Sequence, residues 1–248
     1  ALGLLANTVV NGNTVETGYY EMGDKLELVR KDDAETAGLI RSKFAIPQQV
    51  VSIENSSVLI VDDLGRRWRL PLGDKAYTSL TNEGQLRICR EVATERDLFS
   101  CMGTFYELPA ENADGYAKIR PVSTHNYRIN DYASYRGMLV LTGVNPEEGK
   151  DNEHVIVSND GKAAVWVGVI DDLWQLGKPL GKGGPWKDTS VKADIPSDPY
   201  LIGFYDRKKL TLSHQSTDDI TFTIEADPTG NGDWMEYMVR KVKAGEKW

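Results

Sequence analysis

Short runs in which apolar and polar residues alternate dominate this sequence of 248 residues. A period of two places successive side chains on opposite faces of an extended strand, and the runs are rich in β-branched and aromatic residues, which favour strands. Strands are predicted within residues 25–30, 57–61, 138–141, 163–167, 200–204, 209–212, 220–224 and 235–239. Helical spacing fits only residues 82–94 and 33–43, so the pattern predicts an all-β fold.

Turn-forming residues separate these runs, because Asn, Asp and Gly tolerate the positive φ that tight hairpins require. Hairpin turns are predicted at residues 11–13, 63–65, 159–161 and 228–232. Asp227 and Asp233 give the last of these the oxygen content of a calcium loop. It lacks the DxDxDG spacing and the bidentate Glu of such loops, so we interpret it as a turn.

A weak internal repeat indicates a β-propeller. An aromatic residue, a polar residue, Leu, and then Pro or Gly recur at residues 68–71, 106–109 and 174–177, which lie 38 and 68 residues apart. Units of about 35–45 residues suit four-stranded propeller blades. Residues 200–204, 209–213, 220–225 and 234–242 are predicted to form one such meander of four strands. We expect a single domain over residues 1–248, with a tandem β-sandwich as the alternative fold.

Composition excludes several classes of function. The chain has 29 Lys and Arg against 37 Asp and Glu, a formal charge of −8, and nucleic-acid binding normally requires a basic face. No segment approaches the eighteen apolar residues of a membrane-spanning helix. The start at Ala1 carries no recognisable targeting signal. Three histidines without a Cys/His cluster, and no phosphate-binding loop, predict neither a metal ion nor a cofactor.

Two cysteines, Cys89 and Cys101, flank a polar stretch centred on Glu95. If that stretch is a three-residue hairpin loop, the two residues lie directly opposite each other, within the Cα separation of a disulfide. The alternative is a pair of buried, reduced thiols.

The first candidate site is residues 123–137, which combine a histidine, an aspartate, arginines and tyrosines before a predicted strand. His125 could transfer a proton, with Asp131 as its partner or as a second carboxylate. Arg128, Tyr135 and Arg136 could bind substrate. The structural alternative is that His125 caps a turn and that Asp131 and Arg136 form a solvated ion pair.

The second candidate site is residues 170–188. Asp171 and Asp172 would point to opposite faces of an extended backbone, so only one of them could serve as a catalytic carboxylate. Trp174 and Trp186 bracket a glycine-rich loop that carries Lys182, and aromatic side chains beside carboxylates are typical of carbohydrate sites. The alternative for both tryptophans is packing between blades.

Several segments together resemble the C-terminal half of large secreted β-propeller-type proteins from glycan-degrading gut bacteria. The resemblance covers residues 85–245 and rests on segments 103–109, 124–126, 135–141, 171–179, 183–186, 222–225 and 230–234. It implies a secreted or periplasmic protein that acts on polysaccharides, and an N-terminal half of the same protein as a partner. It assigns no catalytic residue.

These observations lead to two hypotheses. The first is a carbohydrate-active β-propeller, a glycoside hydrolase or polysaccharide lyase with its site at the channel mouth. Under hydrolysis, Asp131 and either Asp171 or Asp172 would be acid and base. Under a lyase mechanism, His125 would move the proton and Arg128 or Arg136 would neutralise a uronate. The second hypothesis is a non-catalytic glycan-binding or structural module, with Tyr135, Trp174 and Trp186 as stacking surfaces.

Overall fold

The computed structural model describes residues 1–11, 13–42, 51–78, 88–91, 96–110, 114–129, 131–147 and 151–248. Within these ranges sixteen strands are accompanied by one α-helix and two 3₁₀ helices, Lys75–Tyr77 and Ile170–Leu176. The strands pair in small antiparallel sheets. The prediction of an all-β fold is therefore confirmed.

The described strands form five sheets. The first two are three-stranded, with the orders β1 (Leu2–Val10), β2 (Asn13–Met22), β3 (Leu28–Lys31) and β4 (Val51–Ile53), β5 (Val58–Val61), β6 (Arg67–Leu70). The third has the order β10 (Arg120–Thr124), β9 (Thr104–Glu107), β8 (Arg96–Cys101), β7 (Ile88–Glu91). The fourth has the order β11 (Tyr132–Tyr135), β12 (Met138–Leu141), β14 (Ala164–Gly168), β13 (Val155–Val157). The fifth is the hairpin of β15 (Ile220–Ala226) and β16 (Met235–Val242).

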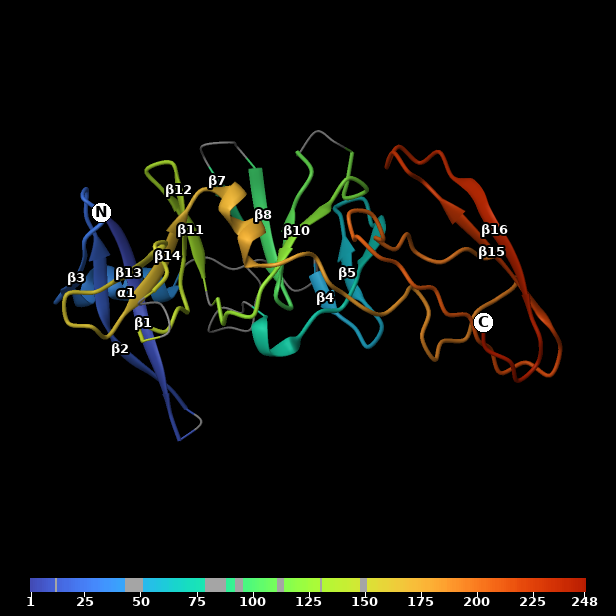
Figure 1. The fold of residues 1–248 in the computed structure, drawn as a ribbon, viewed down its shortest axis with the longest axis horizontal. Coiled ribbons are helices and arrows are strands. Elements are labelled where there is room, and N and C mark those ends of the chain that lie inside the picture. The colour runs from blue at the N-terminus through green and yellow to red at the C-terminus, as the bar shows by residue number, and fades with distance from the viewer. Residues whose placement is uncertain are drawn as a thin grey trace.

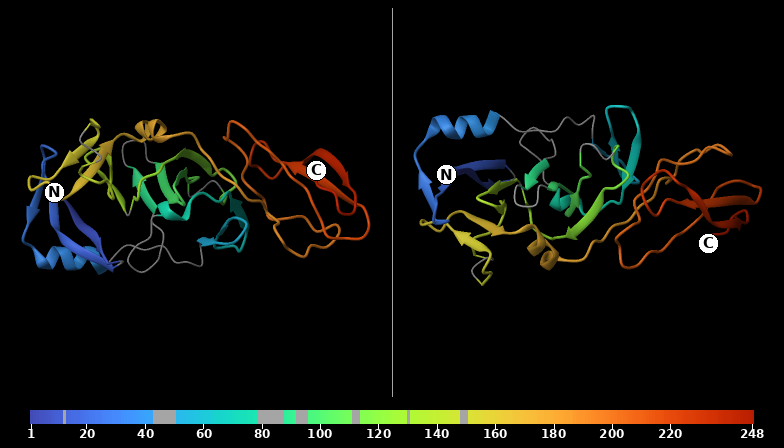
Figure 2. Two further views of the ribbon diagram at one scale, coloured as in Figure 1. Left: turned by 60° about the horizontal axis from the view of Figure 1, so that its bottom comes forward. Right: turned by 90° about the horizontal axis from the view of Figure 1, so that it is seen from above.

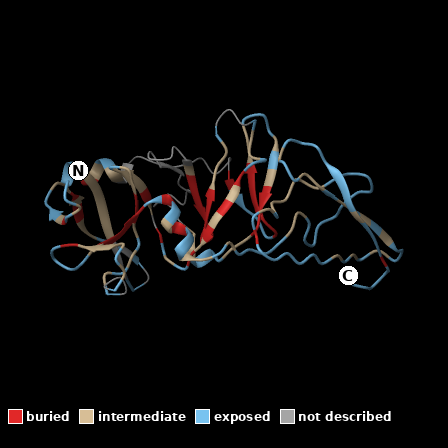
Figure 3. Cartoon of the chain, turned by 45° about the horizontal axis from the view of Figure 1, so that its top comes forward, coloured by how far each residue is buried: buried red, intermediate tan, exposed pale blue. Residues whose placement is uncertain are grey.

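Four sheets lie in a row, and each packs a face against the next (Figure 1). Sheet β4–β6 packs on β7–β10, which packs on β11–β14, which packs on β1–β3. Alternate residues of one strand face the two neighbours: Leu139 and Leu141 of β12 face the cluster shared with β7–β10, whereas Val140 faces β1–β3. The buried residues concentrate on these strands (Figure 3). Alternation therefore builds two cores from one sheet.

The helix α1 (Ala34–Ser42) covers the outer face of sheet β1–β3, within the segment where helical spacing is predicted. Asp33 starts it, because one carboxylate oxygen accepts the Thr36 N–H at 2.9 Å and the other accepts the Thr36 hydroxyl at 2.8 Å. These bonds lower the pKa of Asp33. Gly3 allows the close packing, since a Cβ there would lie 3.0 Å from the Ile40 side chain.

The predicted hairpin turns lie where the sequence places them. Asn11, Gly65, Gly161 and Gly230 all have positive φ, between 51° and 77°. In the last turn, the Asp227 carboxylate accepts backbone N–H groups from Thr229, Gly230 and Gly232 at 2.7–3.1 Å. These bonds from the turn's own backbone show that Asp227 organises the turn, as the interpretation of this segment as a turn expects.

A strap of residues 177–205 crosses from sheet β11–β14 back to sheet β4–β6 (Figure 2). Leu72 and Lys182 exchange backbone hydrogen bonds, and Tyr200 pairs beside Arg69 of β6. The Arg69 guanidinium is nearly buried, and it donates to Glu54 at 2.6 Å and to Asp198 at 2.7 Å. The strap is thus held both by the backbone and by an ion-pair network.

The predicted four-stranded meander at the C-terminus is wrong. Only β15 and β16 pair there, and residues 200–204 and 209–213 form no strand beyond the single bridges of Tyr200 and Ser213. A helix over residues 82–94 is also wrong where the structure describes that segment, since β7 occupies Ile88–Glu91. Apolar content alone does not provide a strand with a neighbour.

Of the two alternatives for the cysteines, the directly opposed pair of Cys89 and Cys101 is wrong, and Cys101 is a reduced, buried thiol. Cys89 of β7 lies opposite Leu98, and Cys101 lies opposite Thr104 of β9. Cys101 is a free, buried thiol whose pKa is raised by burial to about 12. The hairpin register is shifted from the predicted one, and a shift of this kind separates two cysteines that a symmetric loop would bring together.

Candidate functional site

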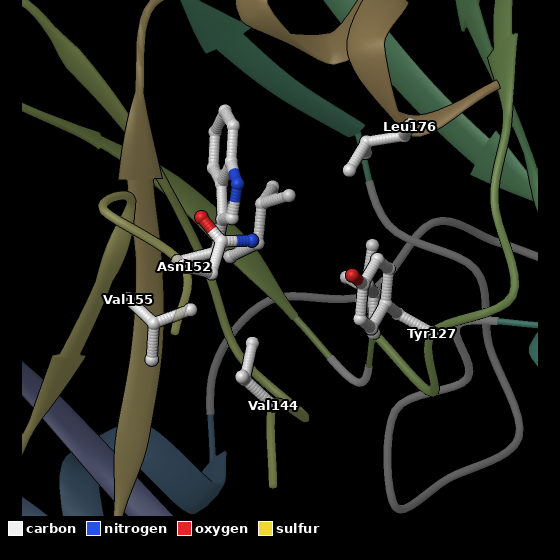
Figure 4. A pocket seen from close by; sticks show the side chains of 8 residues that line it. Tyr127, Val144, Asn152, Val155 and Leu176 are labelled. Atoms are coloured by element: carbon white, nitrogen blue, oxygen red, sulfur yellow. The ribbon is translucent and has the colours of Figure 1, made fainter. Parts of the chain in front are cut away.

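A hollow of about 170 Å³ opens beside β14. Its size far exceeds the 10–15 Å³ or so that a single water requires. The hollow is lined by Asn126, Tyr127, Asn152, His154, Trp166, Asp172, Gln175 and Leu176. A narrow apolar cleft, which adds Ile129, Leu141, Val144 and Val155, continues from it and shares Tyr127, Asn152, Trp166 and Leu176 (Figure 4). Segments far apart in sequence therefore meet around one concave surface.

His154 forms one wall of the hollow. Its ring stacks on buried Trp166 of β14, with ring centroids 5.0 Å apart and planes 30° from parallel. Its Nδ1 lies 3.0 Å from the Val167 carbonyl oxygen, which can only accept, so Nδ1 carries the proton. With the proton on Nδ1, Nε2 faces away from this bond and is the nitrogen that can accept a hydrogen bond.

Asn152 shapes the turn that leads into β13. Its side-chain oxygen accepts the His154 N–H at 2.9 Å, and its backbone carbonyl accepts the Val155 N–H at 2.9 Å. Because the oxygen is occupied, the Asn152 amide nitrogen is the group left to donate to a ligand. Figure 4 shows this side chain between Val155 and Leu176.

Asp172 lies on the 3₁₀ helix Ile170–Leu176, so the extended backbone on which the argument about Asp171 and Asp172 depended is not present. One Asp172 carboxylate oxygen accepts the Val169 N–H at 2.8 Å, which fixes the side chain at the start of the helix. Gly168 makes room for it, since a Cβ there would lie 2.9 Å from this oxygen and 2.4 Å from the Trp166 ring.

Two glycines position the loop that carries Asn126 and Tyr127. Gly143 has φ of +84°, and a Cβ there would lie 1.7 Å from the Arg128 carbonyl oxygen. Gly177 accepts the Thr124 N–H through its carbonyl oxygen at 3.3 Å, and a Cβ on it would lie 2.5 Å from the Thr124 oxygen. Close backbone approach on both sides thus fixes this wall of the hollow.

The polar groups of the hollow suit a small neutral ligand. Asn126, Asn152 and Gln175 offer amide donors and acceptors, His154 offers an acceptor, and Tyr127 offers a ring. Among the described lining residues, Asp172 is the one carboxylate and there is no Lys or Arg. Alternating donors and acceptors beside an aromatic ring can bind hydroxyl groups with their C–H faces.

His125 lies next to the hollow in sequence but does not line it. Its ring is buried, 5.1 Å from the Phe105 ring, and its Nδ1 accepts the Tyr127 N–H at 3.3 Å. Burial lowers the pKa of His125 to about 4, despite an opposing effect of the Tyr127 hydrogen bond. His125 is therefore neutral at pH 7 and holds the loop, as the turn-capping alternative describes.

The buried His125 predicts a loss of stability in mild acid. Its pKa is about 6.5 when unfolded and about 4 when folded, so the unfolded chain binds the extra proton between these values. Stability is present above pH 6.5 and falls by about 3 kcal/mol as the pH approaches 4. Urea unfolding of the wild type and of His125→Gln at several pH values measures this.

His125→Gln is the control, because its side chain cannot take up a proton, whereas the aspartates with lowered pKa titrate alike in both proteins. We expect the difference in free energy of unfolding between the wild type and His125→Gln to become smaller as the pH falls. Parallel curves from pH 7 to 4.5 would show that His125 does not control this loss.

The other predicted residues of the first segment lie apart from the hollow. Asp131 accepts the Tyr132 N–H at 2.8 Å, and its own N–H donates to the Thr142 hydroxyl. Arg136 lies at the β11–β12 turn with φ of 52° and pairs with Asp24 instead of the predicted Asp131. Tyr135 packs on the core shared with sheet β1–β3, and Arg128 is exposed.

Of the residues predicted for the site in the second segment, Asp172 alone lines the hollow. Asp171 and Trp174 are exposed on the same 3₁₀ helix, and Trp186 is 40% exposed on the strap. Lys182 pairs through its backbone with Leu72. None of these four lines the hollow. The two predicted segments nevertheless meet there through other residues, Asn126 and Tyr127 of the first and Gln175 and Leu176 of the second.

Sequence reasoning missed Asn152, His154, Trp166 and Gln175. The one available signal was the pair Asn152 and His154, an Asx-turn residue and a histidine directly before a β-branched strand. Trp166 falls within the predicted strand at residues 163–167 and is buried. Its support of the His154 ring is a tertiary contact that the sequence does not show.

No group of three or more His, Cys, Asp or Glu side chains that could hold a metal ion occurs in the described ranges. The helices of the same ranges include none with the length and apolar character needed to cross a bilayer. Comparisons with protein-family models, with curated proteins and with solved structures find no match to this chain.

Proposed function

We propose that this chain is a glycan-binding module of the β-propeller type, and that the hollow binds one sugar unit of a neutral oligosaccharide. The observation that carries the proposal is the lining of the hollow by amide and imidazole groups and the Tyr127 ring, with one carboxylate and no cation. Sugars present hydroxyl groups and apolar ring faces, which such a lining complements.

The same lining favours binding over catalysis. Glycoside hydrolysis uses two carboxyl groups about 5–9 Å apart, and Asp172 is the one carboxylate among the described lining residues. A lyase acting on uronates needs a cation near the sugar carboxylate, whereas Arg128 is exposed and Arg136 pairs with Asp24. A binding role needs neither group.

The row of four sheets supports the propeller part of the proposal. Successive sheets pack face to face, β7–β10 is a complete four-stranded meander, and the N-terminal sheet β1–β3 packs on sheet β11–β14. These are features of neighbouring propeller blades. The resemblance to proteins of glycan-degrading bacteria adds a secreted or periplasmic setting to the proposal.

A glycan-binding role predicts a specific mutational pattern. A panel of neutral and uronic-acid oligosaccharides is screened for binding, and the best ligand is titrated by calorimetry. Tyr127→Ala and Asn152→Ala should each weaken its binding at least about tenfold, because each removes a direct contact worth roughly 1.4 kcal/mol or more. Trp186→Ala, an exposed aromatic residue outside the hollow, is the matched control and should leave affinity unchanged.

The same panel distinguishes the alternatives. Loss of binding in Trp186→Ala with normal binding in Tyr127→Ala would move the site to the strap. Release of new reducing ends or unsaturated sugars by the wild type would establish an enzyme. Binding of uronic-acid glycans in preference to neutral ones would contradict the neutral-ligand assignment.

A further inference from the structure

The hollow beside β14 and the cleft that continues from it differ in chemistry. The hollow carries polar side chains, among them the His154 imidazole and the Gln175 amide. The residues that the cleft adds are all aliphatic: Ile129, Leu141, Val144 and Val155. A ligand that fills both spaces therefore needs a polar body with one apolar projection.

The cleft is much smaller than the hollow. Its volume is about 20 Å³, whereas that of the hollow is about 170 Å³. Because a single water needs roughly 10–15 Å³, the cleft has room for one group of about the size of a methyl. Water itself is a poor occupant, since a buried water normally makes about two to four hydrogen bonds and the walls of the cleft are mainly aliphatic.

Two valines of the cleft are only partly covered by the protein. Val144 and Val155 pack against the buried core that contains Ile129, Leu141 and Trp166, yet both side chains remain half-buried. Both also line the cleft, and Figure 4 shows them beside Asn152 at the edge of the space. A methyl group placed between them would remove apolar surface from water, which is favourable in proportion to the area covered.

Asn152 lies where the two spaces join, since it lines both of them. Its side-chain oxygen accepts the His154 N–H at 2.9 Å, so its amide nitrogen is the group that can donate to a ligand. On the side of the hollow, His154 Nε2 and the Gln175 side-chain oxygen can accept hydrogen bonds. The junction therefore offers a donor and acceptors next to an apolar space of methyl size.

We propose that the sugar recognised by the hollow and the cleft is an N-acetylhexosamine, an inference that rests on the glycan-binding function proposed above. The sugar ring lies in the hollow, and the carbonyl oxygen of its acetamido group accepts the Asn152 amide N–H. The acetamido N–H donates to His154 Nε2 or to the Gln175 oxygen, and the methyl group fills the cleft between Val144 and Val155.

The acetamido group matches the junction better than other common sugar substituents do. It combines an acceptor, a donor and a methyl group without adding charge, and the lining offers a partner for each of the three. A hydroxyl group in the same place leaves the cleft empty. The methyl group of a deoxy sugar such as fucose fills the cleft, but it brings no carbonyl group for the Asn152 amide.

Calorimetric titration of the full chain with matched sugars tests the proposal. Triacetylchitotriose is compared with cellotriose, and N-acetylgalactosamine with galactose, because the members of each pair differ only in acetamido against hydroxyl groups. In at least one pair the acetylated sugar should bind about tenfold more tightly or better, since it gains a hydrogen bond and buries a methyl group. Among N-acyl derivatives of that sugar, acetyl should bind more tightly than formyl, which leaves the cleft empty, and than butanoyl, which exceeds its volume.

A variant that fills the cleft tests the position of the methyl group. Val144→Phe should reduce the preference for the acetylated sugar from about tenfold to less than about twofold, because the added ring occupies the space of the methyl group. Val191→Phe is the matched control, since Val191 is 51% exposed on the strap and does not line the cleft, and it should keep the full preference. Unchanged circular dichroism shows that both variants are folded.

The outcomes separate this inference from the function on which it rests. Equal binding of the two members in both pairs, or tighter binding of fucose-containing sugars, would overturn the acetamido assignment while glycan binding itself stays supported. A full preference for the acetylated sugar in folded Val144→Phe would also overturn it. If no sugar of either kind binds to the wild type, the proposed function fails and this inference fails with it.

Discussion

Gly143→Ala is expected to destabilise the protein by about 2–5 kcal/mol. A left-handed φ costs a residue with a Cβ about 1–2 kcal/mol, and Gly143 has φ of +84°. The new Cβ would also lie 1.7 Å from the Arg128 carbonyl oxygen, so that backbone must move, which typically costs about 1–3 kcal/mol more. Urea unfolding followed by tryptophan fluorescence measures the loss.

The matched control is Gly161→Ala, at φ of +71° in the β13–β14 turn, where a Cβ meets nothing within 4 Å. It should lose only the conformational part. Movement of Arg128 also displaces the neighbouring Tyr127, so Gly143→Ala should weaken glycan binding while Gly161→Ala should not. Equal destabilisation by the two variants would show that close approach to Arg128 is unimportant.

Phe105→Ala is expected to destabilise the protein by about 3–5 kcal/mol, the usual cost of removing a buried phenyl ring and leaving a cavity. Phe105 of β9 is fully buried. It contacts the Tyr132 ring edge-on at 5.5 Å and the His125 ring at 5.1 Å, and so joins sheet β7–β10 to sheet β11–β14. Thermal and urea unfolding both report this loss.

Phe204→Ala is the control, because the same atoms are removed from a side chain that is 64% exposed. Its effect should stay within about 0.5 kcal/mol. A loss in Phe105→Ala no larger than in Phe204→Ala would contradict the packing of the row through this residue.

Local signals predicted much of the fold. The apolar run at residues 138–141 matches β12, because a strand buried on both faces needs apolar side chains in succession, and the turn-forming residues predicted where the hairpins turn. Partners and registers were not predictable in this way. The runs at 200–204 and 209–212 have strand-like composition. They lie on the strap and on the C-terminal segment that follows it, where no neighbouring strand pairs along them.

The internal repeat shows the same limit. Trp68 and Tyr106 occupy equivalent strands, β6 and β9, each third in its sheet along the chain, whereas Trp174 lies on a 3₁₀ helix. Two of the three matches therefore reflect a shared sheet plan and the third does not.

The candidate site was less predictable than the fold. Of the predicted residues, Asp172 alone lines the hollow. Catalytic roles were predicted for His125 and Asp131 because they are close in sequence, but His125 packs in the core and Asp131 organises a turn. Asn152 and Gln175 reach the hollow through the packing of β13, β14 and the 3₁₀ helix against one loop, and no local pattern encodes that meeting.

The strap changes how such a molecule can lose structure. In a linear stack, each layer is stabilised only by its immediate neighbours, so the outermost layer can detach alone. Here Arg69 of sheet β4–β6, which pairs with Glu54 and Asp198, holds the strap, and the strap begins at sheet β11–β14. Detachment of β4–β6 therefore also disrupts a connection that spans sheet β7–β10, and this couples the opening of β4–β6 to that of β11–β14 in one cooperative event.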